Sequence, residues 1–159
     1  MSGIRDWLDR LQLFFVVAGI GIAGYLTYVK LFGLQPYCAG VGSCEAVQTS
    51  RYAELFGVPV AVWGLLGYAI LLAIYLVKHS DWRDLGELAT MAFFLTTLVG
   101  ALFSAYLTYL ELFVIQAICP WCVGSAIVMT VLFVTSVIEV FGEADEDELL
   151  PEVASTQRR

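Results

Sequence analysis

Charged side chains are scarce in this sequence. Lysine and arginine together number 8, aspartate and glutamate number 15, and these four types make up 14% of the 159 residues, whereas 60% are hydrophobic. No cluster of basic residues is present, which argues against a nucleic-acid-binding surface. Few charges among so many apolar residues are typical of a membrane protein and not of a soluble domain.

Four apolar runs are each long enough to cross a bilayer as a helix, which takes about 20 residues. They are too long and too uniformly apolar to be strands of a soluble sheet. We therefore predict an all-α fold, an integral membrane bundle of four transmembrane helices with a long outer loop between the first helix and the second. We expect the first run to be an uncleaved anchor and not a signal peptide. The four runs cover residues 11–32, 59–77, 88–113 and 121–141.

Two parts of the chain differ in composition. Residues 1–142 are predicted to form the membrane domain, in which small residues such as Gly19 and Ala23 would let helices approach closely. Residues 143–159 carry six acidic and two basic residues and no aromatic ones. That composition is typical of a disordered, solvated segment, so we expect an acidic cytoplasmic tail.

The distribution of basic residues predicts the orientation, because lysine and arginine near helix ends favour the cytoplasmic side. With four spans, both termini and the middle connection share one side. Six of the eight basic residues lie there, and only Lys30 and Arg51 lie on the other side. We therefore expect a multi-pass protein of the plasma membrane with cytoplasmic N and C termini. The six residues are Arg5, Arg10, Lys78, Arg83, Arg158 and Arg159.

All four cysteines fall in or beside the two connections assigned to the exported side. Cys38 and Cys44 lie in the long loop, and Cys119 and Cys122 form a C-x-x-C motif at the start of the fourth run. Exported faces are where disulfides form and persist. Pro120 fits the first turn of a helix, which would make Cys119 the cap residue. Backbone N–H groups at a helix start favour a thiolate, so the pair is expected to be reactive.

Three interpretations of the cysteines are open. Two structural disulfides would each enclose few residues and would stabilise a helical bundle little. A zinc site would need closer spacing in the first pair, and such sites belong mainly to reducing compartments. A thiol–disulfide relay would pass a disulfide between the pairs and on to a lipid-soluble acceptor. No strand–helix alternation surrounds the C-x-x-C motif, which excludes a thioredoxin fold. We favour the relay and expect no metal.

The loop sequence “CAGVGSCEAVQTSRYAELFG”, followed by “CPWC” at the start of the fourth helix, resembles the vitamin K epoxide reductase family. The order of the motifs, the spacing C-x5-C-x5-S-R and the helix placement match over roughly residues 10–141. The resemblance implies a four-helix bundle around a quinone near the exported surface.

The resemblance also implies a role for each cysteine. Cys119 and Cys122 would form the redox-active pair, with Cys122 closest to the quinone. Cys38 would meet a thioredoxin-like protein, and Cys44 would exchange with Cys119. Ser50 would lie near the active centre, although a helix cap in the loop is the simpler explanation of this serine.

Four further residues are candidates for the quinone site. Trp63 lies in the stretch “PVAVWG”, where animal members of the family carry an asparagine, and Ala126 replaces their tyrosine. Phe56 and Trp121 could wall the quinone, although aromatic residues at helix ends more often form an interfacial belt. Glu111 is the only charged residue of the third run. We interpret it as an interfacial carboxylate, with proton delivery as the alternative.

The expected function is that of a membrane thiol–disulfide oxidoreductase. It would couple reduction of menaquinone, ubiquinone or a vitamin K-type quinone to disulfide formation in exported proteins. Many bacterial members of the family carry a fused thioredoxin-like domain, and this chain shows none, so we expect the partner to be a separate thioredoxin-like protein. The alternatives are vitamin K epoxide reduction with the same cysteines and a non-catalytic membrane scaffold. The unrelated bacterial quinone-linked disulfide oxidase is disfavoured, because its C-x-x-C pair lies in the first outer loop.

Overall fold

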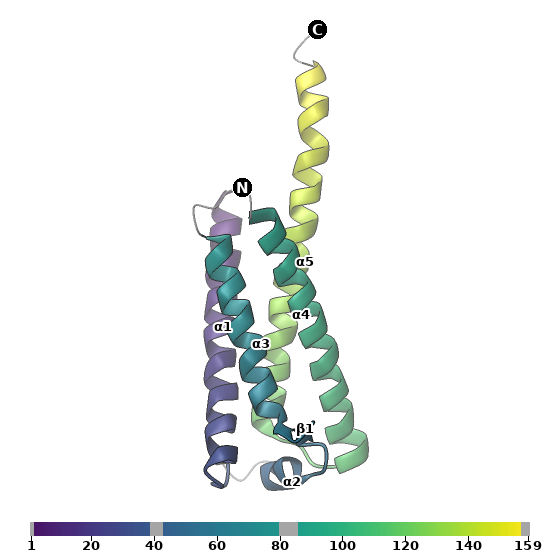
Figure 1. Ribbon diagram of the computed structural model, residues 1–159. Coiled ribbons are helices and arrows are strands. Elements are labelled where there is room, and N and C mark those ends of the chain that lie inside the picture. The colour runs from purple at the N-terminus through teal and green to yellow at the C-terminus, as the bar shows by residue number, and fades with distance from the viewer. Residues whose placement is uncertain (1, 39–42, 80–85, 157–159) are drawn as a thin grey trace.

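Four long helices form the molecule (Figure 1). The computed structural model describes residues 2–38, 43–79 and 86–156. Each long helix contains a segment that is long and apolar enough to span a membrane. The predicted all-α bundle of four membrane-spanning helices is therefore confirmed. The helices are α1 (Ser2–Leu31), α3 (Val60–Lys78), α4 (Gly86–Tyr109) and α5 (Pro120–Thr156).

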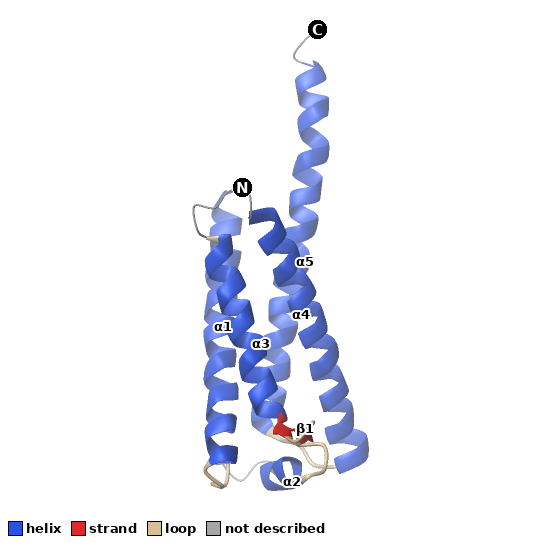
Figure 2. Cartoon of the chain, viewed as in Figure 1, coloured by secondary structure: helices blue, strands red, loops and turns tan. Residues whose placement is uncertain are grey.

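The helices pack in a ring in which each one contacts two neighbours, in the order α1, α3, α4, α5 and back to α1. The short elements gather at the end opposite to the N terminus (Figure 2). There the loop after α1 forms a short helix and a two-stranded antiparallel hairpin, and α4 passes into one turn of π-helix. These elements are α2 (Cys44–Thr49), β1 (Glu54–Leu55), β2 (Val58–Pro59) and η2 (Leu110–Ile115).

Large apolar side chains cover much of the outer surface of the bundle. Phe14 on α1, Leu66 on α3 and Val99 on α4 are all more than half exposed within the protein alone. Patches of this extent are rare on soluble monomers. In hydrocarbon, helices are favoured because their backbone groups are satisfied internally, and these side chains then face lipid. The surface therefore fits the multi-pass membrane protein expected from the sequence.

The core of the bundle is closed by an aromatic side chain packed on a glycine. Tyr68 on α3 is 1% exposed, and a Cβ atom added to Gly19 on α1 would lie 2.2 Å from its ring. The Tyr68 hydroxyl donates a hydrogen bond to the Ser125 carbonyl on α5 at 3.0 Å. Gly19 thus allows the close contact between α1 and α3 that its small size predicted.

Replacing Gly19 by alanine is expected to lower the free energy of unfolding by about 1–3 kcal/mol, because the new methyl group forces the Tyr68 ring out of its place. Gly21 on the same helix is the matched control, since a Cβ there meets nothing within 4 Å. Thermal unfolding of both alanine variants in detergent micelles measures the difference. Equal midpoints for the two variants would contradict the packing described.

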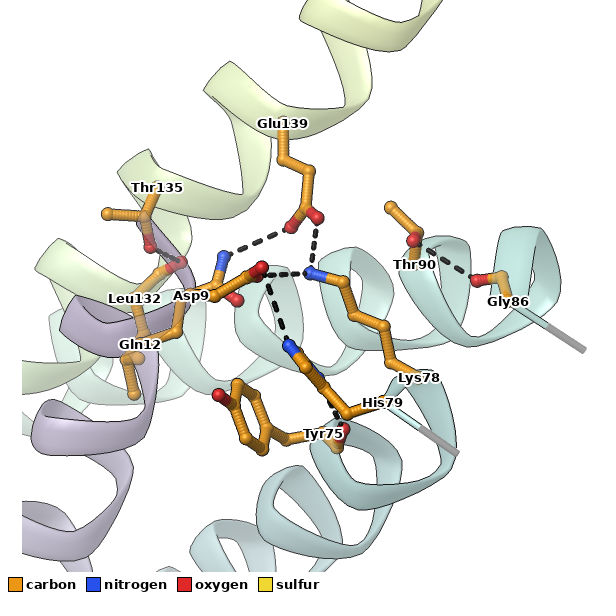
Figure 3. A network of polar contacts seen from close by, with 10 residues as sticks. All are labelled: Asp9, Gln12, Tyr75, Lys78, His79, Gly86, Thr90, Leu132, Thr135 and Glu139. Atoms are coloured by element: carbon orange, nitrogen blue, oxygen red, sulfur yellow. Dashed lines mark hydrogen bonds and ion pairs between the residues drawn. The ribbon is translucent and has the colours of Figure 1, made fainter. Parts of the chain in front are cut away.

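A buried polar network joins α1, α3 and α5 at the end of the bundle where the N terminus lies (Figure 3). The Lys78 Nζ atom lies 3.0 Å from Asp9 Oδ1 and also forms an ion pair with Glu139. Gln12 Nε2 donates to Glu139 Oε2 at 3.1 Å, and His79 Nε2 lies 3.4 Å from Asp9 Oδ2. The charge of Lys78 is therefore shared between two carboxylates inside the bundle.

The structure differs from two sequence expectations. The third run was expected to continue as one helix to residue 113, but α4 ends at Tyr109 and η2 follows. The tail was expected to be disordered, whereas α5 continues to Thr156. An existing helix extends without a new nucleus, and the glutamate, alanine and leucine that follow are good helix formers. Of the basic residues used for orientation, Arg83, Arg158 and Arg159 lie outside the described residues.

Candidate active site

Two segments that carry cysteines meet at the end of the bundle near α2. The Ser43 N–H donates to the Ile118 carbonyl at 3.0 Å, which joins the residues directly before Cys44 and Cys119. Cys44 is 1% exposed and Cys119 is 0% exposed, and both belong to one small buried cluster with Val47. The fold therefore packs one cysteine of each pair in the same place.

The four cysteines are in two redox states. Cys38 and Cys44 form a disulfide with a Cα–Cα distance of 6.3 Å, while Cys119 and Cys122 are free thiols. Cys38 is only half buried, so the disulfide has one sulfur near the surface and one inside. Within the described ranges, no group of three or more histidine, cysteine, aspartate and glutamate side chains is arranged to hold a metal ion.

Cys119 stands at the start of α5, as its position before Pro120 predicted. Its carbonyl accepts the first helical hydrogen bond, from the Val123 N–H at 3.0 Å. The hydrogen bond donated by the Cys122 thiol lowers the pKa of Cys119 to about 7, helped by the backbone N–H groups of Cys122 and Trp121. Burial and the Glu111 carboxylate act in the opposite direction. Cys119 is therefore a substantial fraction thiolate near neutral pH, which is the form that attacks disulfides.

An apolar cavity of about 690 Å³ lies between the helices and reaches Cys122. It is open on one side, where exposed residues such as Leu66 on α3 and Val99 on α4 line it. Its wall is built by all four long helices together with α2 and the hairpin. Cys122 is part of that wall, whereas Cys119 is not. A cavity of this size and character suits a small apolar ligand. The C-x-x-C pair thus has one sulfur toward the loop disulfide and the other toward the cavity.

Three of the candidate residues outside the cysteines line this cavity: Ser50, Trp63 and Ala126. Ser50 also closes α2, because its hydroxyl donates to the Val47 carbonyl at 2.8 Å. Ser50 therefore caps the C-terminal end of α2 and also lines the cavity. The Trp63 indole N–H donates to the Leu55 carbonyl at 3.4 Å and holds α3 against the hairpin. Any contact of these residues with a quinone stays a prediction.

Phe56 and Trp121 are not among the residues that line the cavity. Phe56 is 91% exposed, with φ of 55°, at the turn between β1 and β2. That turn directs its ring away from the bundle. The Trp121 ring packs on Tyr25 at a centroid distance of 4.8 Å, and its N–H donates to the Tyr37 carbonyl at 3.0 Å. A position next to Cys122 in sequence did not place Trp121 at the cavity, because successive helical residues point in different directions.

The structure adds polar wall residues that the sequence analysis did not assign to the site. Tyr68 and Ser125 line the cavity and are hydrogen-bonded to each other. Glu111 also lines it and is 5% exposed, so it is not the interfacial carboxylate that we expected. The sequence did contain one signal for a functional role of Glu111, because it is the only charged residue in the apolar run of residues 88–113. Intramembrane ionisable residues commonly have a function.

Comparison with known proteins agrees with this arrangement. The model of the vitamin K epoxide reductase family matches residues 10–137, which include all four cysteines. The chain is also similar to the thiol-disulfide oxidoreductase LTO1 of Arabidopsis thaliana, with 34% identity over 121 residues. That match covers 73% of this chain and 32% of the plant protein, so the chain spans about a third of its relative. From the cysteine arrangement and the extent of the family match, the chain belongs to the vitamin K epoxide reductase family.

Proposed function

We propose that this protein is a membrane thiol–disulfide oxidoreductase that reduces a quinone and so drives disulfide formation in exported proteins. The observation that carries the proposal is the order of the sulfur atoms. Cys38 is partly exposed, Cys44 and Cys119 are buried together, and Cys122 lines an apolar cavity. This order suits the transfer of an electron pair from a protein at the surface to a lipid-soluble acceptor.

The first exchange involves a separate thioredoxin-like protein in its reduced form. A thiolate of the partner attacks Cys38, the Cys38–Cys44 bond breaks, and Cys44 leaves as a thiolate. The second thiol of the partner then displaces Cys38 from the mixed disulfide. The partner is thereby oxidised to a disulfide, and the loop pair holds two electrons more than before.

The second exchange passes these electrons inward. The Cys44 thiolate attacks Cys119 in the oxidised C-x-x-C pair, a Cys44–Cys119 disulfide forms, and Cys122 is released. Cys38 then attacks Cys44, which restores the loop disulfide and releases Cys119. The resulting state has a Cys38–Cys44 disulfide and two free thiols at Cys119 and Cys122, as in the structure.

The cavity residues fit a quinone as the final acceptor. The wall is mainly apolar, and it includes Ser50, Tyr68 and Ser125, whose hydroxyl groups are each already hydrogen-bonded within the protein. A bound quinone supplies an acceptor for two electrons and two protons. Cys122 and Cys119 close their disulfide as they give up the electron pair.

We further propose that the cysteine end of the bundle faces the exported side of a plasma membrane, with both termini in the cytoplasm. Disulfide formation belongs to that compartment. The N terminus lies at one end of the bundle and α2 at the other, so in this proposal the two would face opposite sides of the membrane (Figure 1). Accessibility of introduced cysteines to a membrane-impermeant thiol reagent would measure the orientation directly.

The protein purified in detergent is expected to reduce menaquinone or ubiquinone when it is supplied with a reduced thioredoxin-like protein. Loss of quinone absorbance and loss of the partner's thiols should occur in a ratio of one quinone to one dithiol. Cys38→Ala should stop turnover with the protein partner. A small dithiol that reaches the inner cysteines should still support part of the turnover in this variant.

Two results would overturn the proposal. Reduction of a vitamin K-type epoxide without reduction of any quinone would favour epoxide reductase activity with the same cysteines. Complete resistance of the Cys38–Cys44 bond to mild reductant, read by mass spectrometry after alkylation, would favour a scaffold with structural disulfides. Turnover with one quinone and not the other would identify the acceptor.

A further inference from the structure

Glu111 combines three features that a merely interfacial carboxylate would not have. It is 5% exposed, it lies in the π-helical turn η2, and it is the only carboxylate among the residues that line the cavity. π-Helical turns are rare and occur frequently at functional sites. Here the turn places the side chain beside the C-x-x-C motif, although eight positions separate Glu111 from Cys119.

The carboxylate of Glu111 contacts both redox-active cysteines. Its Oε2 atom accepts a hydrogen bond from the Cys119 backbone N–H at 3.3 Å. It also accepts a hydrogen bond from the Cys122 thiol. The one proton of the Cys122 thiol therefore has two acceptors within reach, the sulfur of Cys119 and the carboxylate of Glu111.

No cation balances this carboxylate in the described part of the chain, where the ion pairs of Lys30 and Lys78 involve other acidic residues. Burying a carboxyl group in apolar surroundings is costly unless hydrogen bonds or a proton compensate. A carboxyl group differs from a neutral amide of the same shape in that it can take up and release a proton, so its position beside the two thiols suits proton transfer.

We propose that Glu111 is a catalytic proton carrier that takes the proton of the Cys122 thiol and delivers it to the quinone in the cavity. This inference rests on the proposed function. The reduced pair carries one proton when Cys119 is a thiolate, and closing the Cys119–Cys122 bond releases two electrons and that proton. Hydroquinone formation consumes two electrons and two protons, so the second proton comes from water at the outer surface.

Glu111→Gln tests the inference, because glutamine keeps the shape and the hydrogen-bonding capacity but carries no transferable proton. Oxidation of the reduced C-x-x-C pair by menaquinone or ubiquinone should slow by at least about 100-fold, the usual contribution of a general acid–base group. Glu111→Asp should recover part of the rate. Glu87→Gln is the matched control, because Glu87 is an exposed glutamate at the start of α4, the helix that leads into η2.

A second readout does not depend on quinone. The Glu111 carboxylate is one of the groups that raise the pKa of Cys119 against the lowering effect of the Cys122 hydrogen bond. In Glu111→Gln the Cys119 thiolate should therefore form at lower pH than in the wild type. The ultraviolet absorbance of the thiolate, titrated with Cys119→Ser as the blank, measures this shift. The far-ultraviolet circular dichroism and the unfolding midpoint of the variant, compared with those of Glu87→Gln, show whether it is folded.

The outcomes separate this inference from the proposed function. Quinone reduction by Glu111→Gln at the wild-type rate would overturn the role of Glu111 and leave the proposed function intact. The same holds if the Cys119 titration is unchanged. Failure of the wild-type protein to reduce any quinone would overturn the proposed function and with it the inference. A slowed quinone step in a folded variant with a shifted titration supports both.

Discussion

Cys122→Ala is expected to abolish quinone reduction and to trap a disulfide between Cys44 and Cys119. Without the second thiol of the motif, Cys119 has no partner inside the cavity with which to close a disulfide. Its nearest other cysteine is Cys44, in the same buried cluster. A bond between the two in the variant is the arrested form of the internal exchange described above.

The trapped bond is measurable by mass spectrometry after blocking of free thiols and proteolysis. The double variant Cys44→Ala with Cys122→Ala serves as the control, because it should leave Cys119 as a free thiol. Under reducing conditions, where neither variant holds a disulfide, the unfolding midpoints of the two variants should match. Quinone turnover by Cys122→Ala with a reduced partner, or a free Cys119 in the presence of Cys44, would contradict the relay.

Lys78→Met is expected to produce the largest loss of stability, about 3–5 kcal/mol in the free energy of unfolding. The Lys78 side chain is 11% exposed, and its ammonium group lies between Asp9 and Glu139 (Figure 3). Removing it leaves two largely but not fully buried carboxylates without a lysine, and the neighbours that remain in contact with them are Gln12 and His79. The cost arises mainly from these orphaned charges and not from the lost packing of one methylene chain.

Lys30→Met is the matched control, since Lys30 is the lysine in the last turn of α1 as Lys78 is in the last turn of α3. Its ion pair with Glu54 is 3.5 Å long and half exposed on the glutamate side, so its loss should cost about 1 kcal/mol or less. Adding Asp9→Asn and Glu139→Gln to Lys78→Met should restore much of the stability. Equal unfolding midpoints for the two lysine variants would contradict the argument.

The membrane fold followed from the sequence because it depends on long-range averages of hydrophobicity. The four apolar runs correspond to α1, α3, α4 and α5, and Pro120 begins α5 as predicted. The helix ends were less well predicted. The π-helical turn after Tyr109 and the extension of α5 to Thr156 depend on local backbone energies that a hydrophobicity pattern does not contain.

The redox-active cysteines were found from their spacing, but the residues that line the cavity were predicted only in part. Ser50, Trp63 and Ala126 reach the cavity, whereas the hairpin turn carries Phe56 outward. Glu111 was noticed and given a passive role, because a carboxylate near the end of an apolar run was interpreted as an interfacial group. Only the π-helical turn and the loop after it bring Glu111 and Cys119 together.

The polar network was not predicted because its members come from distant parts of the chain. Asp9 and Glu139 are separated by most of the sequence, and His79 was assigned no role. The network also bears on the orientation argument, since Lys78 counted there as a free positive charge. Paired with two carboxylates, it contributes less to that argument than the sequence suggested, and the orientation stays a prediction.

The four cysteines and Glu111 belong to the end of the bundle where α2 and η2 lie, while the network of Lys78, Asp9 and Glu139 belongs to the opposite end. In the proposed reaction, hydrogen ions would therefore be given up and taken up on the same face of the bilayer. Turnover would then be electroneutral with respect to the membrane. The transmembrane voltage, which acts only on charge that crosses the bilayer, would have no direct influence on the rate, and a de-energised vesicle should support it equally well.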